Sequence, residues 1–209
     1  MLAIASLSLI ISFFTPIWSI QLEAPQYPEG LGIKIHLHTI QGEKSNDLES
    51  INGLNHYIGM QRIVPDAIPE LKLMPYIVGA FIAFGLLFAA IGRRTLAWVW
   101  VAVFIVAGVA GMWDFYLWEY DYGHNLDPHA AIRIDDMNYQ PPLIGSKQLL
   151  NFRAISLPDV GGYIIGASVL LGAFAALLKG RDSIKSGKSQ TINFAGPVPE
   201  TVMADEVES

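Results

Sequence analysis

The amino-acid sequence predicts an all-α integral membrane protein with four transmembrane helices and a small extracytoplasmic α+β cap formed by two long loops. The first observation is composition: 52% of the 209 residues are hydrophobic and 15% are charged, whereas soluble domains carry about 25% charged residues. The second is that four apolar runs approach the ~20 residues needed to cross a bilayer. The third is that two long polar segments separate these runs, and each is large enough to fold outside the membrane.

The absence of certain residue types and motifs excludes several kinds of metal site, catalytic site and partner. The chain contains no cysteine, which excludes disulfide bonds, thiolate zinc sites, cysteine-ligated iron–sulfur clusters and cysteine nucleophiles. A formal net charge of -6 at pH 7 argues against nucleic acid as a partner, because phosphate binding needs clustered Lys and Arg. No Gly-x-Ser-x-Gly, His-Glu-x-x-His or phosphate-binding glycine loop occurs. We therefore expect that the protein is not an enzyme.

The apolar runs and polar segments set the expected boundaries. Residues 1–20 contain no charged side chain and predict the first membrane helix. A cleaved signal peptide is the alternative, although the basic n-region and an A-x-A-like cleavage site are missing. The remaining parts are expected as loop 1 (21–72), helix 2 (73–92), a cytoplasmic turn (93–95), helix 3 (96–115), loop 2 (116–159), helix 4 (160–179) and a disordered cytoplasmic tail (180–209).

Basic residues near the membrane predict the orientation. Arg93 and Arg94 occupy the short turn, and Lys and Arg directly follow the last apolar run. The positive-inside rule places both positions in the cytoplasm, together with both termini. Every histidine then lies in an extracytoplasmic loop.

Each long loop contains a pattern of secondary structure. Residues 33–40 alternate between apolar and polar side chains, which predicts a strand with His36 and His38 on its polar face. In loop 2, residues 147–155 predict a short amphipathic helix near the membrane surface.

In the last apolar run, Gly162-x-x-x-Gly166 allows close approach to another helix, although glycine is also common in membrane helices.

The middles of the four apolar runs contain no Asp, Glu, Lys, Arg or His. Ion-coupled transporters keep such residues at membrane depth because transport uses them, and haem between helices needs histidine there. Both functions are therefore disfavoured. By contrast, residues 113–129 combine Trp and Tyr with Glu119, Asp121, Asp127 and two histidines. Amphipathic aromatic rings gather at the edge of a membrane, so this stretch marks one membrane face and concentrates possible ligands.

Metal ligands outside the membrane are the remaining candidate chemistry. His36 and His38 form one pair on a strand face. His56 and Met60 form a second pair, because residues from about 47 to 60 have helical spacing and residues four apart share a helix face. For each pair, a solvated surface or ordinary loop packing is the alternative.

Loop 2 supplies two further histidines. His124 and His129 complete a site if the two loops meet, although His124, between Gly123 and Asn125, also suits a turn hydrogen bond. Imidazole and thioether without cysteine suit copper, particularly Cu(I), while zinc bound by His and a carboxylate stays open.

Two sequence blocks resemble a known family. They are Asn52-Gly53-Leu54-Asn55-His56-Tyr57-Ile58-Gly59-Met60, and Tyr120-Asp121-Tyr122-Gly123-His124-Asn125-Leu126-Asp127-Pro128 with Tyr139-Gln140-Pro141-Pro142-Leu143-Ile144-Gly145 and Leu149-Leu150-Asn151-Phe152. These blocks are similar to small four-span membrane proteins associated with bacterial nitrous oxide reductase gene clusters, beside copper-delivery and maturation proteins. The resemblance implies a bacterial inner membrane protein that supplies copper to an extracytoplasmic enzyme. It assigns no ligands and does not cover His36 and His38.

Two functions follow as expectations. The first is a membrane-anchored factor that handles copper for a periplasmic enzyme, in which His56 and Met60 bind the ion and His124 contributes. The second is a non-catalytic accessory subunit, which docks an extracytoplasmic protein partner through its cap and other membrane subunits through its glycine-bearing helices. In both, the lipid bilayer is the constant partner.

Overall fold

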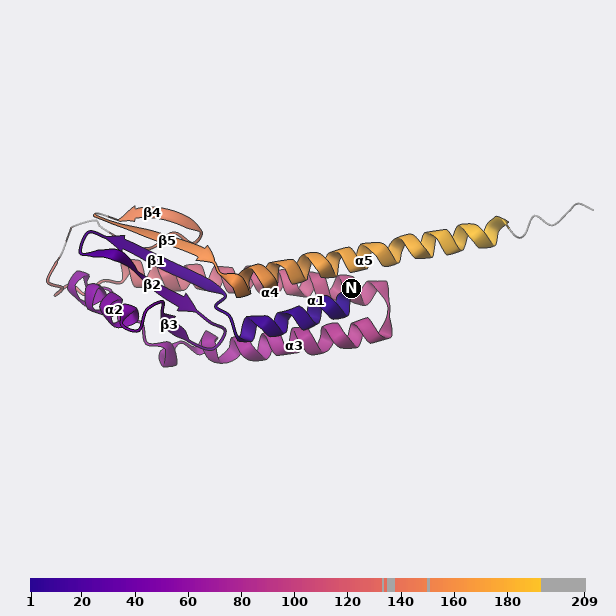
Figure 1. Cartoon of the computed structure of the whole chain (residues 1–209), viewed down its shortest axis with the longest axis horizontal. Helices are drawn as coiled ribbons and strands as arrows, with labels where there is room; N and C mark the ends of the chain where they lie inside the picture. Colours follow the sequence, from indigo (N-terminus) through magenta and orange to yellow (C-terminus); the bar gives the residue numbers. More distant parts are fainter. Residues whose placement is uncertain (133, 135–137, 150, 193–209) are drawn as a thin grey trace, which may run out of the picture.

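The computed structural model describes residues 1–132, 134, 138–149 and 151–192, with 179–192 described by backbone alone. A helix bundle occupies one end of the molecule and a five-stranded sheet the other (Figure 1). The elements are α1 (Leu2–Ser8), η1 (Leu9–Phe13), β1 (Trp18–Ala24), β2 (Tyr27–Ile35), β3 (Ile40–Gly42), α2 (Asp47–Ile58), η2 (Pro65–Ala67), α3 (Pro69–Ile91), α4 (Arg94–His124), β4 (Gly145–Leu149), β5 (Phe152–Pro158) and α5 (Val160–Ile192). We call α1, η1, α3, α4 and α5 the helix bundle, and the described residues of 14–68 and 125–159 the sheet domain.

The prediction of an all-α, four-span protein is wrong. Among the described residues, three helices are long and apolar enough to cross a membrane: α3, α4 and the Val160–Leu178 part of α5. Residues 1–20 do not form a fourth, because their helical part covers only Leu2–Phe13. Residues 18–22 alternate between apolar and polar side chains, which is a strand pattern. Total hydropathy does not distinguish this pattern from a membrane helix, and the chain enters β1 at Trp18.

The sheet is antiparallel, with the strand order β3-β2-β1-β5-β4. β1 lies in the centre of the sheet. It pairs with β2, from the first of the two long segments between the apolar runs, and with β5, from the second. The two segments that separate the apolar runs are therefore parts of one domain. The helix expected over residues 147–155 is also wrong, since residues 147–149 lie in β4 and residues 152–155 lie in β5.

One face of the sheet is apolar and covered. Cross-strand partners share a face, and the pairing of Ile20 with Ile33 places both in the domain core. α2 packs on β2 and β3, and aromatic side chains from the last turns of α4 pack against the same core. α4 is therefore shared: its first part belongs to the bundle and its last part supports the sheet (Figure 1).

Backbone contacts and a buried leucine connect the sheet domain to the bundle. The Gly161 N–H donates to the Pro16 carbonyl at 2.8 Å, and the Asp159 N–H donates to the Ile17 carbonyl at 3.1 Å. Leu37, between β2 and β3, is buried in the core of the bundle. The start of α5 and the segment before β1 are therefore held side by side.

The glycines of α5 do not pack as the Gly162-x-x-x-Gly166 pattern suggested. A side chain at Gly162 would meet the Ile17 carbonyl oxygen, whereas Gly166 has open space around it. Gly172 instead receives the ring of Trp100 from α4. α5 also continues to Ile192, where a disordered tail was expected from residue 180, and residues 193–209 of that tail lie outside the described residues.

Candidate functional site

The end of α2 contacts the segment that follows α4. α2 ends at Ile58 because Gly59 adopts a left-handed conformation with φ of 81°, which glycine tolerates without a Cβ clash. The Gly59 carbonyl accepts the Asp127 N–H at 2.8 Å, and the Tyr57 carbonyl accepts the Ile132 N–H at 2.9 Å. A Cβ on Gly59 would lie 2.9 Å from the Ala130 Cβ. The sequence blocks around His56 and His124 therefore meet through backbone contacts.

Asp127 lies beside His129, one of the candidate histidines, at this contact. The His129 N–H donates to Asp127 Oδ1 at 2.8 Å, and His129 Nδ1 lies 3.4 Å from the same oxygen. The backbone N–H and ring of His129, with a smaller contribution from the charge of His56, lower the pKa of Asp127. The carboxylate therefore remains ionised beside the imidazole of His129.

The other members of the predicted ligand set are arranged differently. Gly59 ends α2 before Met60, so Met60 does not share a helix face with His56 as expected. The Met60 N–H instead donates to the Asn55 carbonyl at 2.8 Å. The His124 ring stacks on Tyr120 with 4.0 Å between centroids, and its Nδ1 lies 3.0 Å from the Tyr120 carbonyl oxygen. One ring nitrogen of His124 is thus already used within α4.

His36 and His38 lie at the other end of the sheet domain, in the connection from β2 to β3. Their ring centroids are 6.1 Å apart, and Leu37 between them points into the bundle core. Burial and the charge of His38 lower the pKa of His36. The rings share one side of the chain, as the alternation predicted, but they lie beyond the end of β2 at Ile35.

Within the described part of the chain, no group of three or more His, Asp or Glu side chains is arranged to hold a metal ion by itself. The structure brings His129 to Asp127 and His36 to His38, and it joins the segment of His56 to that of Asp127 through the Gly59 carbonyl. An ion at either place would need further ligands from water or a partner.

Comparisons with known proteins do not indicate a function for this chain. No protein-family model and no curated protein matches the chain. The function of the chain is therefore inferred from its residues and their geometry.

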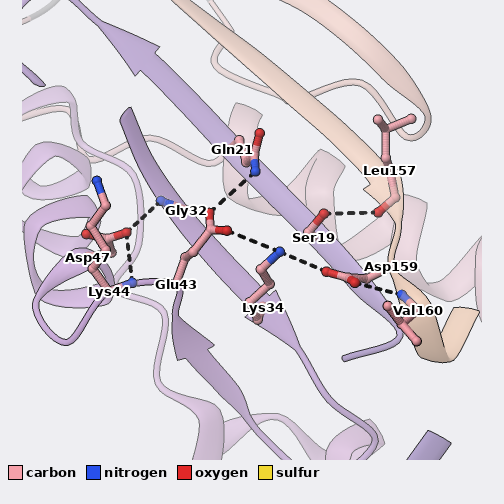
Figure 2. A network of polar contacts seen from close by, with 10 residues as sticks. All are labelled: Ser19, Gln21, Gly32, Lys34, Glu43, Lys44, Asp47, Leu157, Asp159 and Val160. Carbon is pink, nitrogen blue, oxygen red and sulfur yellow. Dashed lines mark hydrogen bonds and ion pairs between the residues drawn. The ribbon is translucent and has the colours of Figure 1, made fainter. Parts of the chain in front are cut away.

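A second polar cluster lies on the uncovered face of the sheet (Figure 2). Lys34 Nζ on β2 lies 2.8 Å from Asp159 Oδ2 and 3.4 Å from Glu43 Oε1. Although burial acts in the opposite direction, Asp159 and Glu43 raise the pKa of Lys34. Burial also opposes the shift of Asp159, whose pKa Lys34 and the Val160 N–H nevertheless lower. The ion pair thus joins the sheet to the start of α5.

Glu119 is the residue in this region whose environment the sequence did not predict. Its side chain is 0% exposed, and neither carboxyl oxygen has a hydrogen-bond partner among the described residues. The buried hydroxyl of Tyr139 also has none. The Tyr139 N–H donates to the Gly123 carbonyl, one turn after Glu119 on α4. The sequence placed Glu119 among exposed acidic groups, because its neighbours Asp121 and His124 carry the same polar signal.

Asp127 was predicted only as one of the possible ligands in residues 113–129, and not as a member of the metal site. The signal that could have found it is the spacing Asp127-Pro128-His129, because an Asp side chain readily accepts the N–H two residues later. That local bond holds His129 beside the carboxylate. The contribution of His56 depends on the contact between the two outer segments, which no local pattern in the sequence indicates.

Proposed function

We propose that this protein is a membrane-anchored, non-enzymatic factor that handles a metal ion, with copper as cargo, for a periplasmic enzyme. The observation that supports it is the contact between the segments of His56 and His129: the Asp127 N–H donates to the Gly59 carbonyl, and the His129 ring lies 3.4 Å from Asp127 Oδ1. The proposed location is the inner membrane of a bacterium, crossed more than once. The basic turn at Arg93 and both ends of the chain face the cytoplasm, and the sheet domain faces the other side.

The chemistry of His56, His129 and Asp127 suits transfer better than storage, because among the described residues they do not form a complete metal site by themselves. Two imidazoles and one carboxylate provide nitrogen and oxygen ligands of the kind that copper and zinc accept. All three residues are solvent-exposed, so an incoming protein reaches the ion directly and completes its coordination. Ligand exchange with a partner then moves the ion without any covalent step.

Metal titration of the purified protein in detergent tests the proposal. Because the site offers imidazole and carboxylate without a thioether, we expect copper to bind as Cu(II), with modest affinity and a stoichiometry of one. His56→Ala and His129→Ala should each weaken binding roughly 10-fold or more, the usual consequence of losing a ligand interaction. His124→Ala is the matched control, because that ring is engaged with Tyr120. Equal affinity in wild type, His56→Ala and His129→Ala would contradict the proposal, and preference for Zn(II) would contradict copper as cargo.

A second candidate function is docking without metal. The observation that favours it is an open cavity of about 460 Å³ between the β1–β2 hairpin and the segment after β3, lined in part by Tyr27, Pro28 and Lys44. A non-catalytic accessory subunit would seat a partner segment there. A photo-crosslinking residue in place of Tyr27 in native membranes should then capture one defined partner, and the same residue in place of exposed Tyr57 should not. Equal capture by both would contradict a specific docking cavity.

A further inference from the structure

Exposed apolar side chains gather where the sheet domain joins the bundle. Ile144 precedes β4 and is 60% exposed, and Leu157 near the end of β5 is 41% exposed. The pairing of Gly145 with Ser156 places these two residues at the same end of the β4–β5 hairpin. Val160 and Tyr163, at the start of α5, are 53% and 64% exposed. The apolar surface therefore continues from the sheet onto a helix long enough to cross a membrane.

The length of the helices sets the depth of this surface. A bilayer core takes about 20 helical residues, and that count from the α3–α4 turn reaches Lys72 on α3 and Asp114 on α4. Arg94 Nε donates to the Ala176 carbonyl at 3.2 Å, which aligns that part of α5 with the same turn. Counting back from Ala176 over the same height reaches the first residues of α5 and then the end of β5. Fewer residues are needed on the strand, because each strand residue rises further than a helix residue. The open end of the hairpin thus lies level with the charged residues that mark the membrane boundary.

We propose that this end of the sheet domain, at Ile144 and Leu157, rests in the headgroup layer of the membrane and holds the domain at a fixed height. This inference relies on the membrane anchoring in the proposed function. Lipid is the occupant because Val160 and Tyr163 carry the exposed apolar side chains onto α5, which is long and apolar enough to cross a membrane. Burying apolar side chains in that layer stabilises the contact, and the Tyr163 ring suits an interface where one end of the side chain is wet.

The depth has a limit, which the strand geometry sets. β4 is an edge strand, and its unpaired backbone groups cannot enter hydrocarbon without losing their hydrogen bonds to water. The polar side chains Ser146, Lys147 and Gln148 occupy the strand beyond Ile144. The sheet therefore touches the membrane with its end and does not insert.

Site-directed spin labelling tests this placement. The chain has no cysteine, so single nitroxide labels at Ile144→Cys and Leu157→Cys can be placed in the full chain, in phosphatidylcholine vesicles. Leu170→Cys, on the exposed surface of α5, is the lipid control, and Glu29→Cys, in the β1–β2 hairpin, is the water control. We expect the labels at 144 and 157 to collide more with oxygen, relative to a water-soluble nickel chelate, than the label at 29. They should also be shallower than the label at 170.

The two controls distinguish the possible failures. Labels at 144 and 157 that behave like the label at 29, while 170 reports lipid, would overturn the headgroup contact and leave membrane anchoring intact. A label at 170 that behaves like the one at 29 would overturn both. Replacement of Ile144 with Trp, followed by quenching with lipids brominated near the headgroup, repeats the measurement without a bulky label and should give the same depth.

Discussion

The helix bundle and the sheet domain are stabilised in different ways. In the bundle, small residues let helices approach closely: Gly85 faces Ser6 and Trp100, and Ser8 Oγ lies 2.8 Å from Ser168 Oγ. On the uncovered face of the sheet, charged side chains form the network around Lys34 (Figure 2). Shape complementarity suits lipid, where apolar burial gives little drive for helix association. The two regions therefore differ in kind: close apolar and small-residue contacts hold the bundle, and ion pairs lie on the sheet.

The largest expected effect comes from filling a close contact in the bundle. Gly85→Leu would force a side chain against Ser6 and to within 2.8 Å of Trp100 Nε1, and we expect a loss of about 3 kcal/mol in the free energy of unfolding. Denaturant titration in detergent micelles measures it. Gly79→Leu on the same helix is the control, because nothing lies within 4 Å of a Cβ there. Equal stability of the two variants would mean that α1 and α3 do not pack as described.

An intermediate effect is expected at the connection between the two regions. Lys34→Met leaves Asp159 without its cation, and we expect a loss of about 2 kcal/mol, since an unpaired, partly buried charge costs more than an exposed one. Lys44→Met is the control, because its partner Glu29 is largely exposed and such surface pairs contribute about 0 to 1 kcal/mol. Unfolding in micelles compares the two variants. A Lys34 variant no less stable than the Lys44 variant would contradict the joining role of the network.

The same pair predicts a pH dependence. The lowered pKa of Asp159 adds stability that is present above its unfolded pKa of about 3.9 and is lost as the pH falls through the folded pKa. The raised pKa of Lys34 adds stability that is present below its unfolded pKa of about 10.4 and is lost as the pH rises through the folded pKa. Asp159→Asn should therefore flatten the acid side of the unfolding curve. An acid limb unchanged in this variant would assign the dependence to other carboxylates.

The smallest expected effect is a gain in stability. Glu119→Met replaces a buried carboxyl that has no partner among the described residues with an apolar side chain of similar length, and we expect unfolding to cost about 1 kcal/mol more. Asp121→Met on the exposed side of α4 is the control and should change stability by less than about 0.5 kcal/mol. Loss of stability in Glu119→Met would show that the carboxyl has a structural partner.

Sequence patterns predicted the long apolar elements better than the sheet. α3, α4 and α5 follow from continuous hydropathy, whereas β1 was hidden because Trp18, Ile20 and Leu22 extend an apolar run that precedes them. The pairing of β1 with β5 joins residues such as Gln21 and Ile155, and no local pattern reports such a contact.

In the candidate site, too, local patterns predicted contacts between neighbouring residues but not contacts between distant segments. The local bond between Asp127 and His129 is readable from spacing, but the position of His56 depends on Gly59 ending α2 and binding Asp127. The i, i+4 pairing of His56 with Met60 failed because the left-handed glycine between them ends the helix. The burial of Glu119 was likewise out of reach, since it arises from packing between distant segments.

Accessibility from the two sides of the membrane tests the central claim most directly, namely that a sheet domain stands on one side of a bundle whose basic turn lies on the other. Arg93→Cys and Glu29→Cys are made singly in the cysteine-free chain, and intact cells are treated with a membrane-impermeant thiol reagent. We predict labelling of the cysteine at 29 in intact cells, and labelling of the cysteine at 93 only after lysis. Labelling of both in intact cells, or of neither before lysis, would contradict the account.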